Sequence, residues 1–337
     1  MANPNAENFA QDRYQQMLYQ RSGRSGLLLP AIALGAWETF GGYCDEEVTR
    51  ACLYRAFDLG MTHFDLSNNY GKPAGNAELI VGKIVRDMPR DELIISTKAG
   101  YSMWPGPYGE WLSKKYLVAS LDQSLKRLGL EYVDIFYAHR PDLETPLEET
   151  MAALDLLVRQ GKVLYVGVSN FAAAHYEQAV QVSQKMGLAP ITLHQTQYNL
   201  LNRSCEKDLF DATQRHGSGV ITFSPLAQGR LTNKYLGESI PKHSRAAAWW
   251  GKERREDVLS SHELEQVQRL NAIAQERGQT LAQMAIAWIL RMPAVTSVLI
   301  GASQVKQIEE NVAALYNYFF SDEELQAIDE ITLPAQA

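Results

Sequence analysis

Four residues that can exchange protons stand in, or just after, apolar stretches with the character of buried strands: Asp65, Tyr70, Lys98 and His139. Asp65 interrupts the stretch 62–67 and precedes Tyr70 by five positions. A carboxylate inside a buried strand is costly unless a cation or hydrogen bonds pair with it. Each residue alone is well explained as a structural pair or a surface group. The combination on three successive strand-like stretches is harder to explain structurally.

Together these four side chains suit proton donation to a developing alkoxide. A tyrosine with a pKa near 10 is a poor acid at neutral pH. The ammonium group of Lys98 is expected to lower the pKa of Tyr70, and Asp65 is expected to keep that lysine charged despite burial. His139 can hydrogen-bond a substrate oxygen and polarise it. Such chemistry is useful when a hydride reaches the carbon of a carbonyl group.

For these side chains to meet, their strands must lie side by side with their ends together. Amphipathic helical stretches alternate with eight stretches of strand character: 31–37, 62–67, 93–99, 133–140, 163–170, 191–199, 219–227 and 296–303. These stretches are nearly continuous in apolar residues, as parallel strands covered on both faces are. The pattern predicts a (β/α)8 TIM barrel rather than an open doubly wound sheet.

Segments outside this alternation complete the predicted organisation of one domain over residues 1–337. An N-terminal β-hairpin is expected over 17–37, around a Gly-Ser turn, and the polar extension 1–16 is expected to be poorly ordered. Long loops follow the third and seventh strands, at 100–116 and 227–259. Loops above about 15 residues are usually functional, and barrel active sites lie at the carboxyl ends of the strands.

Composition excludes several classes of function. Lys and Arg number 32 against 39 Asp and Glu, a net charge of -7, which lacks the basic footprint of a nucleic-acid binder. The three cysteines and the remaining histidines have no metal-ligand spacing, so no metal is expected. Neither a signal peptide nor a membrane-spanning stretch is recognisable, and a soluble, cytoplasmic protein with no membrane contact is expected.

The sequence resembles the aldo-keto reductases from about residue 18 to residue 332. The resemblance rests on the order and spacing of FDLSNNYG, IISTKAG, YVDIFYAHRPD, GKVLYVGVSNF, HQTQYNLLNR, FSPLAQGRLTNKY and SVLIGASQVKQIEENV. Within the family, it is greatest to bacterial reductases of L-glyceraldehyde 3-phosphate and methylglyoxal. The branch containing potassium-channel β-subunits is similar to a lesser degree.

The resemblance implies an NADPH-dependent reductase of small aldehydes or ketoaldehydes. It makes Tyr70 the general acid, Lys98 and Asp65 its ion pair, and His139 the residue that orients the carbonyl. Two alternatives stay open: an NADP(H)-binding redox-sensing or regulatory subunit with slow turnover, and an aldolase that forms a Schiff base on Lys98. The resemblance also implies a homo-oligomer, a tetramer or octamer.

No GxGxxG fingerprint follows the first strand, so the resemblance implies NADPH or NADP+ extended across the barrel mouth. The residues carried over for the cofactor are Trp37, Asp65, Ser169, Asn170, Gln195, Phe223, Ser224, Pro225, Leu226, Gly229, Leu231, Lys234, Arg245, Gly301, Ser303, Gln307, Glu310 and Asn311. Those carried over for the substrate pocket are Trp37, Tyr70, Trp104, His139 and Arg140. Independently, "GAS" opens a helix directly after a strand, a common place for phosphate. Ser303 is also explained as a plain N-cap, and Arg245 as a solvated loop charge. The third-loop aromatics suit either a lid or a subunit contact.

Overall fold

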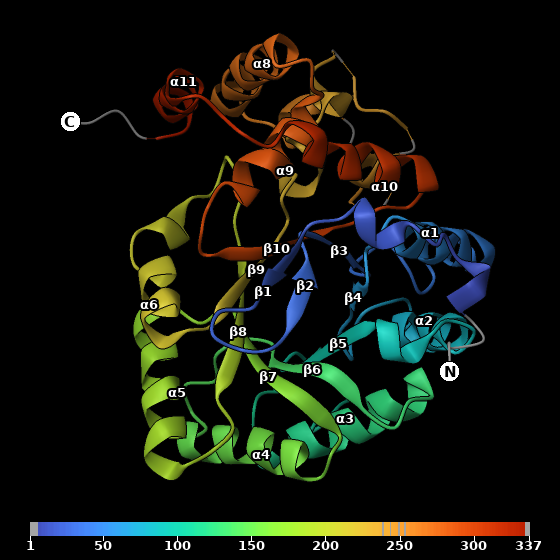
Figure 1. The fold of residues 1–337 in the computed structure, drawn as a ribbon, viewed down its shortest axis with the longest axis vertical. Helices are drawn as coiled ribbons and strands as arrows, with labels where there is room; N and C mark the ends of the chain where they lie inside the picture. The colour runs from blue at the N-terminus through green and yellow to red at the C-terminus, as the bar shows by residue number, and fades with distance from the viewer. Residues whose placement is uncertain (1–5, 238, 243, 249, 253, 334–337) are drawn as a thin grey trace. The chain divides into compact units, whose positions relative to one another are not determined.

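The structure, a computed structural model, describes residues 6–237, 239–242, 244–248, 250–252 and 254–333. Within these residues, eight parallel strands close into a barrel in the order β10-β3-β4-β5-β6-β7-β8-β9 (Figure 1). Their bounds are β3 (Ile32–Gly35), β4 (His63–Asp65), β5 (Ile94–Ala99), β6 (Val133–Ala138), β7 (Val163–Ser169), β8 (Ile191–Gln197), β9 (Gly219–Phe223) and β10 (Val295–Ile300). The predicted barrel is confirmed, and its strands are shorter than the apolar stretches from which they were predicted.

The chain forms two compact units. The first consists of Met1–Thr196, Cys205–Phe223 and Ala294–Glu309, and the second of Gln197–Ser204, Ser224–Pro293 and Glu310–Ala337. The first unit carries the barrel strands, apart from the last residue of β8. The single domain expected over residues 1–337 stays a prediction.

Helices of the first unit follow the strands and begin and end where local chemistry favours it. They are α1 (Glu46–Asp58), α2 (Asn76–Val85), α3 (Lys114–Leu128), α4 (Leu147–Arg159), α5 (Ala173–Met186) and α6 (Leu209–His216). The Oγ atom of Ser113 accepts a hydrogen bond from the amide of Tyr116 at the start of α3, and Gly129 ends the helix with φ 66°. Acidic residues open α1 and α4, where the helix dipole stabilises them.

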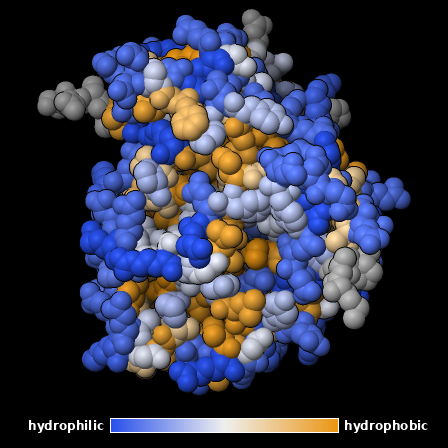
Figure 2. Space-filling model, viewed as in Figure 1, coloured by the Kyte–Doolittle hydropathy of each residue, from blue (hydrophilic) through white to orange (hydrophobic). Residues whose placement is uncertain are grey.

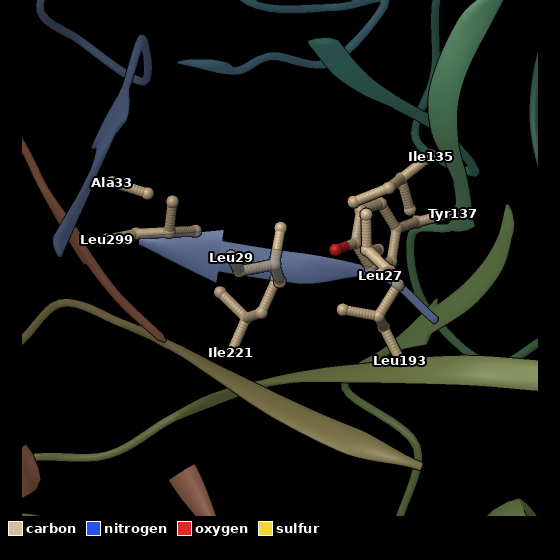
Figure 3. Close-up of a cluster of buried hydrophobic side chains, with 8 residues drawn as sticks. All are labelled: Leu27, Leu29, Ala33, Ile135, Tyr137, Leu193, Ile221 and Leu299. Atoms are coloured by element: carbon tan, nitrogen blue, oxygen red, sulfur yellow. The ribbon is translucent and has the colours of Figure 1, made fainter. Parts of the chain in front are cut away.

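An antiparallel hairpin, β1 (Tyr19–Arg21) and β2 (Leu28–Pro30), contributes to the core of the barrel unit. Leu27 and Leu29 lie among side chains of five barrel strands, β3, β6, β8, β9 and β10, in a buried cluster (Figure 3). Leu28, between them, is 51% exposed. Figure 2 shows hydrophobic residues at the surface around β2. The strand therefore alternates as expected, with one face in the core and the other outward.

The second unit contains α7 (Arg245–Ala248), α8 (Ser261–Glu276), α9 (Leu281–Leu290) and α11 (Asp322–Thr332). Helix α10 (Val305–Val312) begins in the first unit and ends in the second. Reciprocal side-chain and backbone hydrogen bonds form capping boxes at the starts of α8, α9 and α11. The side chain of Arg277 pairs with Glu324 at 2.5 Å, which joins the end of α8 to the start of α11.

No helix within the described ranges has both the length and the apolar character needed to cross a bilayer.

Residues 6–16 differ from the poorly ordered extension that was expected. Phe9 packs edge-on against Tyr54 and Phe57, and Arg13 forms an ion pair with Glu92 at 2.5 Å. Residues 1–5 lie outside the described residues.

Gly167 in β7 has no room for a side chain. A Cβ atom there would lie 2.3 Å from Cδ1 of Tyr137, a fully buried residue of β6. We therefore expect Gly167→Ala to lower the free energy of unfolding by about 1–3 kcal/mol, the usual cost of overpacking. Urea denaturation measures this loss. Gly26→Ala is the control, because nothing lies within 4 Å of its added Cβ. Equal unfolding midpoints for the two variants would contradict the prediction.

Candidate active site

Asp65 and Lys98 form a buried ion pair at the carboxyl ends of two neighbouring strands. β4 and β5 are paired in register, Asp65 beside Ser96, so the two charged side chains meet inside the barrel. Nζ of Lys98 donates to Oδ2 of Asp65 at 2.5 Å and to the carbonyl of Leu66 at 2.7 Å. Lys98 is 0% exposed, a burial that a lysine tolerates only with such partners.

Tyr70 occupies the third contact of the lysine. Its Oη lies 3.5 Å from Nζ of Lys98, and its ring stands edge-on to His139 with 5.9 Å between ring centroids. The loop after β4 is held by its own backbone, since the amides of Gly75 and Ala77 both donate to the carbonyl of Tyr70. The structure thus brings the four residues singled out in the sequence together.

Asp65 has two further partners that the sequence did not reveal. Its Oδ1 accepts from Oγ of Ser96 at 2.7 Å and from Nε2 of Gln195 at 3.1 Å. His63 extends this network, with its Nε2 2.8 Å from Oγ of Ser96. Burial lowers the pKa of His63 to about 4, so the ring is neutral at pH 7. The only signal in the sequence is that residues 63, 65, 96 and 98 alternate along two adjacent strands.

The expected lowering of the tyrosine pKa is wrong for this structure. Burial, together with Asp65 and Tyr101, raises the pKa of Tyr70 well above 10. The main reason is that the phenol is fully buried, which disfavours its charged form, and the negative charge of Asp65 acts in the same direction. Burial also lowers the pKa of Lys98, and Asp65 opposes that shift. Tyr70 is therefore a protonated phenol at neutral pH.

His139 directly follows β6 and is 7% exposed. Burial lowers its pKa well below 6.5, and the charges of Lys98 and Arg140 act in the same direction. Its Nδ1 lies 3.0 Å from Oγ of Ser67, and the ring of Tyr101 stands edge-on to it at 4.7 Å. Neither Ser67 nor Tyr101 was singled out from the sequence. Ser67 follows β4 and Tyr101 follows β5, so both contacts join His139 to segments that are distant along the chain.

Arg140 holds the long loop after β5 to the end of β6. Its guanidinium lies 4.4 Å from the ring centroid of Tyr101 and 3.8 Å from that of Trp111. It also pairs with Glu110 and donates to the carbonyl of Gly100. The expected place of Arg140 in a substrate pocket stays a prediction, as does the choice between a lid and a subunit contact for the aromatic residues of this loop.

Trp104, also expected in the substrate pocket, packs against Tyr116 of α3 with 5.1 Å between ring centroids. Oη of Tyr116 donates to the carbonyl of Tyr101 and accepts from Nδ2 of Asn68. In the long loop after β5, the aromatic residue that contacts His139 is therefore Tyr101, while Trp104 packs against Tyr116 of α3.

Polar side chains continue around the barrel at the ends of β7 and β8. Ser169 and Gln195 are register partners, and Nδ2 of Asn170 donates to the carbonyl of His139 at 3.0 Å. Asn170 adopts φ 61°, a left-handed conformation that asparagine tolerates better than most residues. Hydroxyl, amide and carbonyl groups of this kind can match the donors and acceptors of a carboxamide.

Other residues expected at the cofactor lie in the first unit at the ends of β3, β9 and β10. Trp37 follows β3 and is 40% exposed, and Phe223 ends β9 against the core cluster. Gly301 follows β10. The amide of Ser303 donates to Oε1 of Gln307 at 2.9 Å, so these two residues cap the start of α10. A hydroxyl and an amide at a helix start suit an anion.

The remaining expected cofactor residues belong to the second unit: Ser224, Pro225, Leu226, Gly229, Leu231, Lys234, Arg245, Glu310 and Asn311. The segment after β9 is tightly turned, with φ 55° at Ser224 and 96° at Gly229. Lys234 is exposed, and Leu231 and Asn311 are buried. Arg245 begins α7, and its side chain lies outside the described part of the structure.

The first unit thus joins a neutral phenol, a neutral imidazole and a buried ion pair at the ends of β4, β5 and β6 (Figure 1). The described residues contain no cluster of three or more His, Cys, Asp or Glu side chains able to hold a metal ion. The phenol can give a proton to a negative oxygen, and the imidazole can hydrogen-bond the same oxygen.

Comparison with known proteins agrees with this chemistry. A model of the aldo/keto reductase family matches residues 31–333. The chain is 53% identical over 325 residues to a protein of Escherichia coli O157:H7 named L-glyceraldehyde 3-phosphate reductase, covering 95% of this chain and 93% of that protein. It is 39% identical over 318 residues to a putative voltage-gated potassium channel subunit beta of Schizosaccharomyces pombe, covering 92% and 91%.

Proposed function

The chain belongs to the aldo/keto reductase family of oxidoreductases, which use nicotinamide cofactors, and we propose that it reduces small aldehydes or ketoaldehydes with NADPH. Tyr70 is the general acid of this proposal. The observation that carries it is the contact of Lys98 with both Asp65 and Tyr70, at 2.5 and 3.5 Å, beside the ring of His139.

Each side chain has a defined task in the reduction. When bound, the reduced nicotinamide supplies a hydride to the carbonyl carbon. His139 hydrogen-bonds the carbonyl oxygen, and Tyr70 gives its hydroxyl proton to that oxygen as negative charge develops. Lys98 then stabilises the tyrosinate by its charge, and Asp65 fixes the lysine in place. A proton from solvent restores the phenol.

The cofactor assignment is supported by the residues of the first unit. Ser169, Asn170 and Gln195 gather hydroxyl and amide groups at the ends of β7 and β8, which suits the nicotinamide carboxamide. Nε2 of Gln195 donates to Oδ1 of Asp65, which ties this amide to the buried ion pair. Within the first unit, we assign the 2′-phosphate that distinguishes NADPH to Ser303 and Gln307 at the start of α10.

The substrate class follows the name of the Escherichia coli relatives. The test is a screen of cofactor oxidation by the purified protein, with NADPH and NADH, over methylglyoxal, both glyceraldehyde 3-phosphates and an aromatic aldehyde. We expect the highest kcat/KM with NADPH and L-glyceraldehyde 3-phosphate or methylglyoxal. Oxidation of neither cofactor with any aldehyde would reject the proposal.

A second function is favoured by the likeness to channel β-subunits, a cofactor-binding regulatory protein with slow turnover. Single-turnover kinetics separates the two functions. A reductase releases one oxidised cofactor after each hydride transfer and does so rapidly, whereas in the regulatory protein slow release of the oxidised cofactor would limit turnover. An aldolase acting through Lys98 is disfavoured, because the lysine is fully engaged by Asp65, Leu66 and Tyr70 and is not a free nucleophile.

We extend the proposal to a cytoplasmic homo-oligomer of four or eight copies without nucleic-acid or membrane partners. Its support is the family resemblance of the sequence and a net charge of -7. Light scattering of the purified protein gives the mass in solution, and a monomer would contradict this part of the proposal.

The reductase rate is expected to show no titration of His139 or Tyr70 between about 6.5 and 10, the ordinary pKa values of histidine and tyrosine. The pKa of His139 lies well below this window, so the ring stays neutral throughout it. The pKa of Tyr70 lies well above it, so the phenol keeps its proton. Measurement of kcat against pH checks this. A midpoint inside the window that belongs to either residue would contradict it.

A further inference from the structure

The imidazole of His139 is neutral and therefore carries a single N–H, on one of its two nitrogens. Nδ1 lies 3.0 Å from Oγ of Ser67, so Nε2 is the nitrogen left to meet a substrate. If the proton is on Nε2, the ring can donate a hydrogen bond to a carbonyl oxygen. If the proton is on Nδ1, Nε2 has a lone pair, which repels that oxygen. The function of His139 thus depends on its tautomer.

Ser67 controls the hydrogen bonding of Nδ1. Ser67 is completely buried, and several acceptor atoms lie within reach of its single hydroxyl proton. Besides Nδ1 of His139, these are Oδ1 of Asn69 at 2.8 Å, the carbonyl of Lys98 at 3.2 Å and Oδ1 of Asn68 at 3.5 Å. Since one proton cannot serve four acceptors, the competing groups decide where it goes.

The competing acceptors have other donors or orientations, which leaves the Ser67 hydroxyl proton for Nδ1. If the hydroxyl turned to Asn69 instead, Nδ1 would have to carry the ring proton and donate it to Oγ. The carbonyl of Lys98 already accepts from the amide of Asn68 at 2.9 Å. The terminal amide of Asn69 can turn its NH2 group toward Ser67, which makes it a donor to Oγ. Asn68 is the most distant of the four. An acceptor at Nδ1 without a donor would be a buried unsatisfied group, which costs stability.

We propose that Ser67 donates its hydroxyl proton to Nδ1 of His139 and thereby holds the ring in the tautomer with its proton on Nε2. Ser67 is then a positioning residue for the reduction, an assignment that rests on the proposed function. Ser67 lies between Asp65 and Tyr70 in the loop after β4. This loop therefore carries the acid, Tyr70, and also the residue that orients His139, which polarises the carbonyl.

The direct test reads the tautomer without any reaction. In protein labelled with 15N-histidine, the nitrogen that carries the proton has a resonance far from that of the bare nitrogen, and His139→Asn assigns the signals. We expect the His139 proton on Nε2 in the unmodified protein at neutral pH. In Ser67→Ala we expect a mixture of tautomers, and in Ser67→Thr, which keeps the hydroxyl, the original one. A proton on Nδ1 in the unmodified protein would overturn the inference.

Kinetics gives a second, separable measure. We expect Ser67→Ala to lower kcat about tenfold, the effect of one hydrogen bond, with KM for NADPH unchanged. Ser183→Ala is the matched control, because it removes a buried hydroxyl whose hydrogen bond among the described residues is to the carbonyl of Ala179 in its own helix. An unchanged kcat in Ser67→Ala would count against the inference. Absence of reductase activity in the unmodified protein rejects the proposed function instead, and leaves the tautomer to the spectra.

Discussion

Tyr70→Phe is expected to lower kcat for aldehyde reduction by about 100-fold to 10,000-fold, the range that general acid catalysis contributes. The substitution removes a single oxygen atom, the one that lies 3.5 Å from Nζ of Lys98. With the pKa of Tyr70 well above 10, the phenol is fully protonated at neutral pH, so the substitution removes the group that gives a proton to the substrate oxygen. Steady-state kinetics measures the loss, and titration of protein fluorescence with NADPH measures the affinity for the cofactor.

The affinity for NADPH is expected to stay within a few-fold, because Ser169, Asn170 and Gln195 are untouched. Tyr176→Phe is the control. Its hydroxyl, on α5, donates to Oγ of Ser218 at 2.6 Å, next to the amino end of β9 and so at the opposite end of the strand from the candidate site. This variant should keep the kcat of the unmodified protein. Full activity in Tyr70→Phe would refute the assignment of the acid, and a matching loss in both variants would point to a structural cause.

Lys98→Met should have the largest effect on stability. It leaves the carboxylate of Asp65, which is 3% exposed, without its cation. Breaking a buried ion pair by removing one partner typically costs about 3–5 kcal/mol. The hydrogen bonds from Ser96 and Gln195 remain and favour the lower part of that range. Urea denaturation, followed by far-UV circular dichroism, gives the change.

The double variant Asp65→Asn with Lys98→Met distinguishes charge from packing. Because it removes both charges, it is expected to recover most of the stability lost in Lys98→Met, while remaining inactive. If the double variant is no more stable than the single one, the loss comes from packing around the lysine stem. A loss below about 1 kcal/mol in the single variant would show that the pair contributes as little as an exposed one.

The fold and the grouping of Asp65, Tyr70, Lys98 and His139 could both be predicted, because they depend on local sequence pattern and on the order of the strands. Continuous apolar stretches alternating with amphipathic helices lead to parallel strands, and successive strands of a barrel are neighbours. Asp65, Lys98 and His139 end or follow three successive strands, so a barrel brings them together whatever fills the rest of its interior. The strand bounds were less accurate, since apolar residues continue into the loops beyond the last ladder hydrogen bond.

What only the tertiary structure decided is the environment of each group. The sequence, through its residue types and their periodicity, determined which charged side chains share one end of the barrel. It could not give the direction of the pKa shift of Tyr70, because that depends on how deeply the phenol is buried and on the charge of Asp65 beside it. Nor could it reveal that Arg140 is held by Tyr101 and Trp111. Burial and side-chain partners arise from contacts between distant segments, and no local pattern encodes them.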